Sequence, residues 1–279
     1  MHATRRIVLA FLLCGAMTGA ARATGYDDFA RGMTAVTRND PDGAIAAFTA
    51  ALGDGDLSSA LVPQAYRGRA RAYLDEDRCA DALADMDAAL KLKPGEGDLV
   101  AQHGSAAACL DKFDIALADY DALIAVKFST SIYRARGALH LRMGDPAAAI
   151  ADFSTYVSLV EYDAYGVLWL EMARAGAGAL DPSVAADDVR RFREDEWPVA
   201  LLKLYAGELK PDDIAAAVAQ GDASEQADRQ CDADFYLGEW WLTQRDISPA
   251  KPLLQHARDT CRHDLLIWVL AGKELQHLK

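Results

Sequence analysis

Side chains that could carry out catalysis or bind a metal form no recognisable constellation in this sequence. Histidines such as His103, His140, His256 and His263 are scattered without the spacing of metal ligands. There is no His-Glu-x-x-His motif, no Gly-rich phosphate loop after a strand and no serine elbow. Acidic runs such as 194–196 are typical of solvated turns. The sequence therefore predicts a protein that is not an enzyme and that uses no cofactor or metal.

The N-terminal segment 1–23 has the pattern of an export signal. Arg5 and Arg6 precede an apolar run at positions 7–16, and Ala21-Arg22-Ala23 supplies a small-x-small cleavage pattern. The apolar run is too short for a permanent membrane span. We therefore expect a periplasmic protein, cleaved before Thr24, with no integral membrane segment afterwards.

A lipid anchor through Cys14 is the alternative for this region. Bacterial lipoprotein signals normally place Gly, Ala or Ser before the modified cysteine, whereas Leu13 stands there in this chain. Signal cleavage is therefore the favoured interpretation.

The charge of the chain argues against two classes of partner. The formal net charge is −13, and loss of segment 1–23 removes three arginines and no acidic residue, which gives −16. A general nucleic-acid-binding protein needs a basic face to neutralise phosphates, and anionic lipids attract basic segments. We therefore expect neither nucleic acid nor an anionic lipid surface as the partner.

A recurring triplet of residues indicates the fold that must position all these side chains. A Gly or Ala is followed after twelve residues by Ala, and after four more by a bulky apolar residue, as in Gly32/Ala44/Phe48, Ala70/Ala82/Met86, Gly104/Ala116/Tyr120, Gly137/Ala149/Phe153 and Gly238/Ala250/Leu254. The first four units recur with a period of about 34 residues, which is typical of paired-helix repeats. Small residues let paired helices cross closely. Asp40-Pro41 and Asp145-Pro146 are expected to start second helices.

The pattern resembles the tetratricopeptide repeat. The second unit supplies Tyr66, Ala70, Tyr73, Ala82, Met86, Ala89 and Pro94, and the fourth supplies Tyr133, Gly137, Ala149, Phe153 and Tyr156. The resemblance implies an all-α solenoid of antiparallel helix pairs without a β-sheet. The alternative is an ordinary amphipathic helical bundle. We expect four repeat units at 24–160, a degenerate repeat with linker helices at 161–230, and a C-terminal repeat-like unit at 231–279.

The second half has a closer resemblance. The stretches 165–170, 197–209 and 235–239 are similar to the NlpI-type periplasmic repeat proteins, and the similarity weakens after Cys261. The resemblance implies an adaptor that brings periplasmic proteases to cell-wall hydrolases and that forms homodimers.

Alignment of the units places the remaining four cysteines in two groups. Cys79 is expected to open the second helix of unit two and Cys109 to close the first helix of unit three, at the same end of the stack. Cys231 is expected to open the first helix of the last unit and Cys261 to close its second helix. The sequence predicts disulfides between Cys79 and Cys109 and between Cys231 and Cys261. The alternative is four separate buried thiols.

Arginines on the first helices are the most suggestive functional feature. In this repeat family, positions flanking the small residue of the first helix face the concave groove, and Arg67, Arg71, Arg134 and Arg142 lie on such helices. Their guanidinium groups predict a groove for a peptide carboxylate or acidic side chains. The alternative is that each arginine pairs with an Asp on an adjacent helix.

Two functions remain open from the sequence. The favoured one is a non-catalytic periplasmic scaffold that holds a partner protein or peptide. The other is a cell-wall hydrolase, which needs a desolvated Glu or Asp in a cleft with sugar-binding aromatic residues nearby.

Overall fold

A computed structural model describes residues 24–261 and 266–278. The predicted signal peptide, Cys14 and His263 lie outside the described residues. Within them the structure contains α-helices, one short 3-10 helix and no β-strand, which confirms the predicted all-α fold. None of the described helices combines the length and the apolar character needed to cross a bilayer.

The helices follow one another with short connections. Their bounds are α1 Gly25–Thr37, α2 Pro41–Gly53, α3 Val62–Asp75, α4 Cys79–Leu92, α5 Gly97–Cys109, α6 Phe113–Ala125, α7 Ser131–Met143, α8 Pro146–Leu159, α9 Ala164–Gly176, α10 Pro182–Val189, α11 Val199–Tyr205, α12 Ile214–Val218, α13 Ala223–Thr243, α14 Ile247–Thr260 and α15 Leu266–His277. A 3-10 turn, Pro211–Asp213, precedes α12.

Two of the predicted helix starts depend on Asp-Pro pairs. The Asp40 side chain accepts a hydrogen bond of 2.9 Å from the amide of Gly43, and Asp145 accepts one of 3.0 Å from Ala148. The following proline occupies the first helical position, where no intrahelical amide bond is lost. Both predicted starts of second helices are therefore confirmed.

The triplets mark the contact between the two helices of each unit. A Cβ atom added to Gly104 would lie only 2.8 Å from a ring carbon of Tyr120. Equivalent separations are 2.7 Å for Gly32 to Phe48, 3.0 Å for Gly137 to Phe153 and 2.7 Å for Gly238 to Leu254. The alanine of each triplet's second helix is completely buried. The small residues therefore let large side chains fill the space between paired helices.

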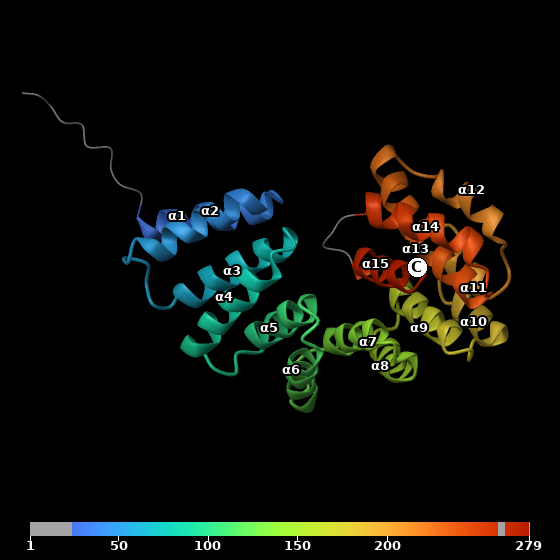
Figure 1. Ribbon diagram of the computed structural model, residues 1–279, viewed down its shortest axis with the longest axis horizontal. Helices are drawn as coiled ribbons and strands as arrows, with labels where there is room; N and C mark the ends of the chain where they lie inside the picture. Colours follow the sequence, from blue (N-terminus) through green and yellow to red (C-terminus); the bar gives the residue numbers. More distant parts are fainter. Residues whose placement is uncertain (1–23, 262–265, 279) are drawn as a thin grey trace, which may run out of the picture.

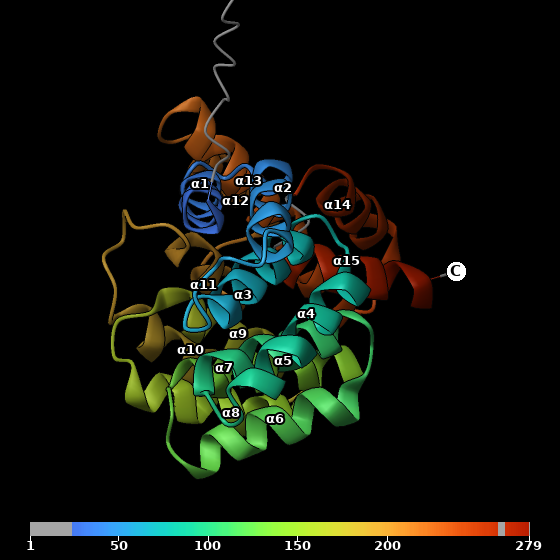
Figure 2. The same cartoon turned by 90° about the vertical axis from the view of Figure 1, so that its left-hand side faces the viewer.

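The units are arranged along a curved path. Figure 1 shows the pairs α1/α2, α3/α4, α5/α6 and α7/α8 following one another, with α9 to α15 continuing at the other end. In the view along the array, helices α12 to α14 return to the level of α1 and α2 (Figure 2). The array therefore coils instead of forming a flat row, and α15 packs against α13, α14 and the inner helix α7.

One predicted helix start needs correction. Cys231 was expected to open the first helix of the C-terminal unit, but that helix, α13, begins at Ala223 and runs for 21 residues. Asp222 accepts hydrogen bonds from the amides of Ser224 and Glu225, while Glu225 accepts one from the amide of Asp222. This capping box starts the helix two turns before Cys231.

Candidate functional site

A cavity of about 720 Å³, called the inner cavity below, is lined both by helices of the regular repeats and by helices that follow them. Its walls come chiefly from the first helices α5 and α7, from α9, and from α13, with Ile267 of α15 at one side. Cavities of this size accommodate small ligands or a few side chains. The first helices α5 and α7 therefore contribute to the walls, and a groove along the whole array stays a prediction.

The floor of the cavity is aromatic. The Phe153 ring stacks on Trp169 with centroids 6.2 Å apart, and Trp169 meets Tyr236 edge to face at 5.6 Å. All three side chains are buried. Phe153 belongs to the triplet of unit four, Trp169 to α9 and Tyr236 to α13. The floor therefore joins the regular repeats to the C-terminal helices.

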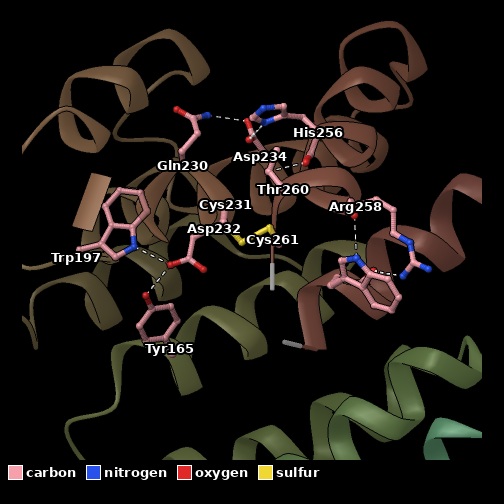
Figure 3. Close-up of a disulfide and its surroundings, with 11 residues drawn as sticks. Tyr165, Trp197, Gln230, Cys231, Asp232, Asp234, His256, Arg258, Thr260 and Cys261 are labelled. Atoms are coloured by element: carbon pink, nitrogen blue, oxygen red, sulfur yellow. Dashed lines mark hydrogen bonds and ion pairs between the residues drawn. A yellow bond between two sulfur atoms is a disulfide. The ribbon is translucent and has the colours of Figure 1, made fainter. Parts of the chain in front are cut away.

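One wall carries a carboxylate held by neutral donors. The Tyr165 hydroxyl donates a hydrogen bond of 2.6 Å to Asp232, and the Trp197 indole nitrogen donates one of 2.8 Å to the same oxygen (Figure 3). Burial raises the pKa of the Asp232 carboxyl, the two hydrogen bonds oppose this effect, and the nearby Asp228 charge raises the pKa further. Burial also raises the pKa of the Tyr165 hydroxyl.

Arg134 provides a cation at the cavity. Its side chain is 48% exposed, and its guanidinium lies 3.9 Å from Asp163 and 5.7 Å from the centre of the Tyr156 ring. The Tyr156 hydroxyl donates a hydrogen bond of 2.5 Å to Asp163. The pKa of Tyr156 is raised to about 12, chiefly by burial and secondly by this hydrogen bond. Asp163 also caps α9 through the amide of Gly166.

The structure does not gather the four predicted arginines around this cavity. Only Arg134 lines it. Arg67 contacts Asp98 at 3.3 Å and Arg71 is exposed. Arg142 bonds to Asp111 at 2.8 Å beside a separate cavity of about 230 Å³, and burial lowers the pKa of its guanidinium. Arg67 therefore pairs with an Asp on another helix, as the alternative stated, and Arg142 pairs with an Asp in the turn between α5 and α6.

Sequence reasoning missed a second set of cations that connects neighbouring units. Arg69 donates two hydrogen bonds of 2.7 Å to Asp85 of its own unit and one of 2.9 Å to Thr49 of the preceding unit. Arg136 donates bonds of 2.8 and 2.6 Å to Asp152 of its own unit and also bonds to Asp121 of the preceding unit.

The histidine of unit three occupies the same position. His103 Nδ1 lies 2.6 Å from Asp119 of its own unit, and Nε2 lies 3.3 Å from Asp87 of unit two. We call Arg69, His103 and Arg136, with their partners, the interunit ladder. In units two, three and four, the available signal was a basic residue directly before the small residue of the triplet, together with an Asp directly before its bulky residue. This ladder fixes each of these three units against the previous one.

The histidine makes one step of the ladder sensitive to pH. Its hydrogen bond to Asp119, and then the charges of Asp119 and Asp87, raise the pKa of His103 above that of a free imidazole, although burial opposes them. Protonated His103 therefore stabilises the folded protein fully below about pH 6.5, and this stabilisation is lost as the pH rises through the pKa of His103 in the folded state. We expect His103→Arg, which copies its neighbours in the ladder, to reduce the loss of stability between pH 5.5 and pH 8.5, measured by urea denaturation. An unchanged loss would contradict this role.

The cysteines come together in the two predicted pairs, although one of them does not lie at the predicted helix start. The structure joins Cys79 to Cys109 and Cys231 to Cys261, with Cα atoms 5.8 and 5.3 Å apart. Cys79 opens α4 and Cys109 closes α5. Cys261 follows α14, whereas Cys231 lies within α13, and Figure 3 shows the disulfide between these two cysteines. Formation of both bonds in the native protein stays a prediction.

Each pair closes a loop with a sequence separation of 30 residues. We expect each bond to raise the free energy of unfolding by about 3 to 4 kcal/mol. Non-reducing peptide mapping should find these two pairs, and denaturation of the Cys79→Ala/Cys109→Ala double variant should show the loss. Other pairings or free thiols in the exported protein would contradict the prediction.

Comparison with known proteins supports the fold alone. No protein-family model and no curated protein matches the sequence. A solved tetratricopeptide-repeat protein from Parabacteroides merdae matches with a TM-score of 0.59 at 16% identity, over 89% of this chain and 98% of that one. The MamA protein matches with a TM-score of 0.49 at 18% identity, over 67% of this chain and 96% of that one. The C-terminal part of a tetratricopeptide-repeat protein from Cytophaga hutchinsonii matches with a TM-score of 0.48 at 14% identity, over 86% of this chain and 85% of that one. The chain therefore has the fold of a tetratricopeptide-repeat solenoid.

Proposed function

We propose that this protein is a non-catalytic scaffold that binds a segment of a partner protein in the inner cavity. The observation that carries the proposal is the cavity of about 720 Å³ formed by α5, α7, α9 and α13. These elements are packed helices, so that little conformational freedom is lost in the walls on binding. An aromatic floor with charged groups at the sides suits a peptide better than a metal or phosphate group.

The proposed location is the periplasm. The export signal expected at positions 1–23 and the two cysteine pairs support it, because disulfides persist in oxidising compartments. In line with the NlpI-type resemblance, the scaffold acts as an adaptor that links a periplasmic protease to enzymes of the cell envelope, and it acts as a homodimer. The mass of the mature protein tests this proposal. A mass that corresponds to a chain beginning at Thr24 supports a cleaved periplasmic protein, whereas a lipid on Cys14 would show a lipid-anchored protein instead.

A cell-wall hydrolase remains the second candidate because the structure contains a carboxyl group suited to general acid catalysis. Burial raises the pKa of Glu239 to about 8, and Glu239 lines a cavity of about 260 Å³. No aromatic side chain is among the described residues that line this cavity. A sugar ring would therefore have no stacking surface there, and the scaffold is the function the geometry supports better.

The scaffold is tested by filling the cavity. Ala135→Trp introduces a large ring into the α7 wall, whereas Ala30→Trp places the same ring on the exposed surface of α1. We expect periplasmic proteins that cross-link to the wild type to be lost with Ala135→Trp, with affinities falling at least about tenfold, and to be retained with Ala30→Trp. Unchanged binding by Ala135→Trp, or hydrolysis of peptidoglycan by the purified protein alone, would overturn the proposal.

A further inference from the structure

The charges of the inner cavity are not balanced. Asp228 and Asp232 both line it and lie four residues apart on α13, which places them on one face of that helix. Asp228 is exposed. The one cation that lines the cavity among the described residues, Arg134, is closest to a third carboxylate, Asp163. The α13 wall therefore presents two carboxylates to the cavity without a matching cation.

Asp232 is held in place without being neutralised. Its two hydrogen-bond donors, Tyr165 and Trp197, are uncharged groups that fix the orientation of the carboxylate (Figure 3). Arg229, although it follows Asp228 directly, donates to the carbonyl oxygens of Ala217 and Gln220. Both donors engage one oxygen of Asp232, and its other oxygen has hydrogen-bonding capacity left for a ligand.

The neighbouring aromatic groups suit the same kind of ligand. Tyr165 is partly exposed at the cavity, and Trp169 lies on its floor. The faces of such rings attract ammonium and guanidinium groups, and the attraction strengthens where water is excluded. Carboxylates beside aromatic rings are complementary to a cation on an apolar stem, which is the chemistry of lysine and arginine side chains.

We propose that the cavity recognises a basic side chain of the bound peptide, with its cationic group against Asp228 and Asp232 and its apolar stem along Tyr165 and Trp169. This inference rests on the proposed scaffold function and names the class of peptide that it binds. It reverses the preference for acidic groups that the predicted arginine groove implied. The arginines Arg67 and Arg142 already have carboxylate partners, while the α13 carboxylates have none among the described charged groups that line the cavity.

Three fluorescent peptides that differ at one position test the inference on the exported full-length protein. Each has the sequence Gly-Ala-Tyr-x-Tyr-Ala-Gly, in which x is lysine, norleucine or glutamate. We expect the lysine peptide to bind about tenfold more tightly than the norleucine peptide, because a charge-assisted contact is gained. Asp228→Asn and Asp232→Asn should each remove most of this difference, and Asp212→Asn, on the exposed turn before α12, should leave it unchanged.

The outcomes separate the two proposals. Tighter binding of the glutamate peptide, or equal binding of all three, would overturn the basic-side-chain inference and leave the scaffold intact. Absence of binding by every peptide, together with partner cross-linking unaffected by Ala135→Trp, would overturn the cavity as the binding site. Unchanged thermal unfolding midpoints of the Asn variants confirm that lost binding is not lost folding. A loss of discrimination confined to Asp232→Asn, with Asp228→Asn unaffected, would overturn the shared role of the two carboxylates.

Discussion

Replacing Phe153 with alanine is expected to lower the free energy of unfolding by about 4 kcal/mol. The Phe153 ring is completely buried, faces Gly137 of its own unit and stacks on Trp169 of α9. Its loss removes apolar contacts and leaves a cavity at the point where the regular repeats meet the C-terminal helices. The floor of the binding cavity changes as well, so that partner binding should weaken in the same variant.

Chemical denaturation monitored by circular dichroism measures the effect. Tyr162→Ala is the control, because Tyr162 is also aromatic and lies in the loop after α8 but is 79% exposed. We expect the control to change stability by less than about 0.5 kcal/mol. A loss below about 1 kcal/mol for Phe153→Ala would show that this ring does not hold the two halves together.

Replacing Arg136 with methionine is expected to lower the free energy of unfolding by about 3 kcal/mol at pH 7. Asp152 is buried and receives two hydrogen bonds from Arg136, and the Nε2 atom of His140 lies 3.8 Å from its carboxylate. Without the guanidinium, an ionised carboxylate stays in an environment of low polarity. The contact with Asp121 is lost too, which loosens unit four from unit three.

A second substitution shows whether the penalty comes from the unpaired carboxylate. The double variant Arg136→Met/Asp152→Leu should regain most of the loss, because no unpaired charge remains.

An exposed pair supplies the matched comparison for this variant. Arg193 and Asp195 lie 3.0 Å apart with both side chains largely exposed. Arg193→Met should leave the denaturation midpoint almost unchanged, since water screens such pairs. Equal effects of Arg136→Met and Arg193→Met, or additive effects of Arg136→Met and Asp152→Leu, would contradict a buried coupled pair.

Local signals in the sequence were sufficient for the helices and their pairing. The small and bulky members of each triplet lie on the two helices of one unit, and in the four triplets that begin with glycine the structure brings them close together. Asp-Pro pairs mark helix starts because the capping contact involves residues only three apart. The same alignment placed Cys79 beside Cys109, because both lie at ends of adjacent antiparallel helices.

The candidate site was less accessible to such reasoning. Of the four predicted arginines, Arg134 lines the cavity, whereas Arg67 and Arg142 contact acids 31 residues away in the sequence, beyond the local pattern. Asp232, Tyr165 and Trp197 meet across 67 and 35 residues of sequence, in the region where the repeat spacing is irregular. The early start of α13 was also missed, because its capping box lies outside the repeat register.

By itself the sequence determined the repeated helix pairs, because small residues, large residues and caps act within one unit and recur at a nearly constant period. Only the tertiary structure decided which charges face the cavity and which are already paired. Those contacts depend on how far the array curves and on where α9, α13 and α15 return against the regular units. The curvature of the array results from the small rotations at many helix contacts, so no single sequence motif encodes it. Which charged side chains face the cavity depends on this overall curvature.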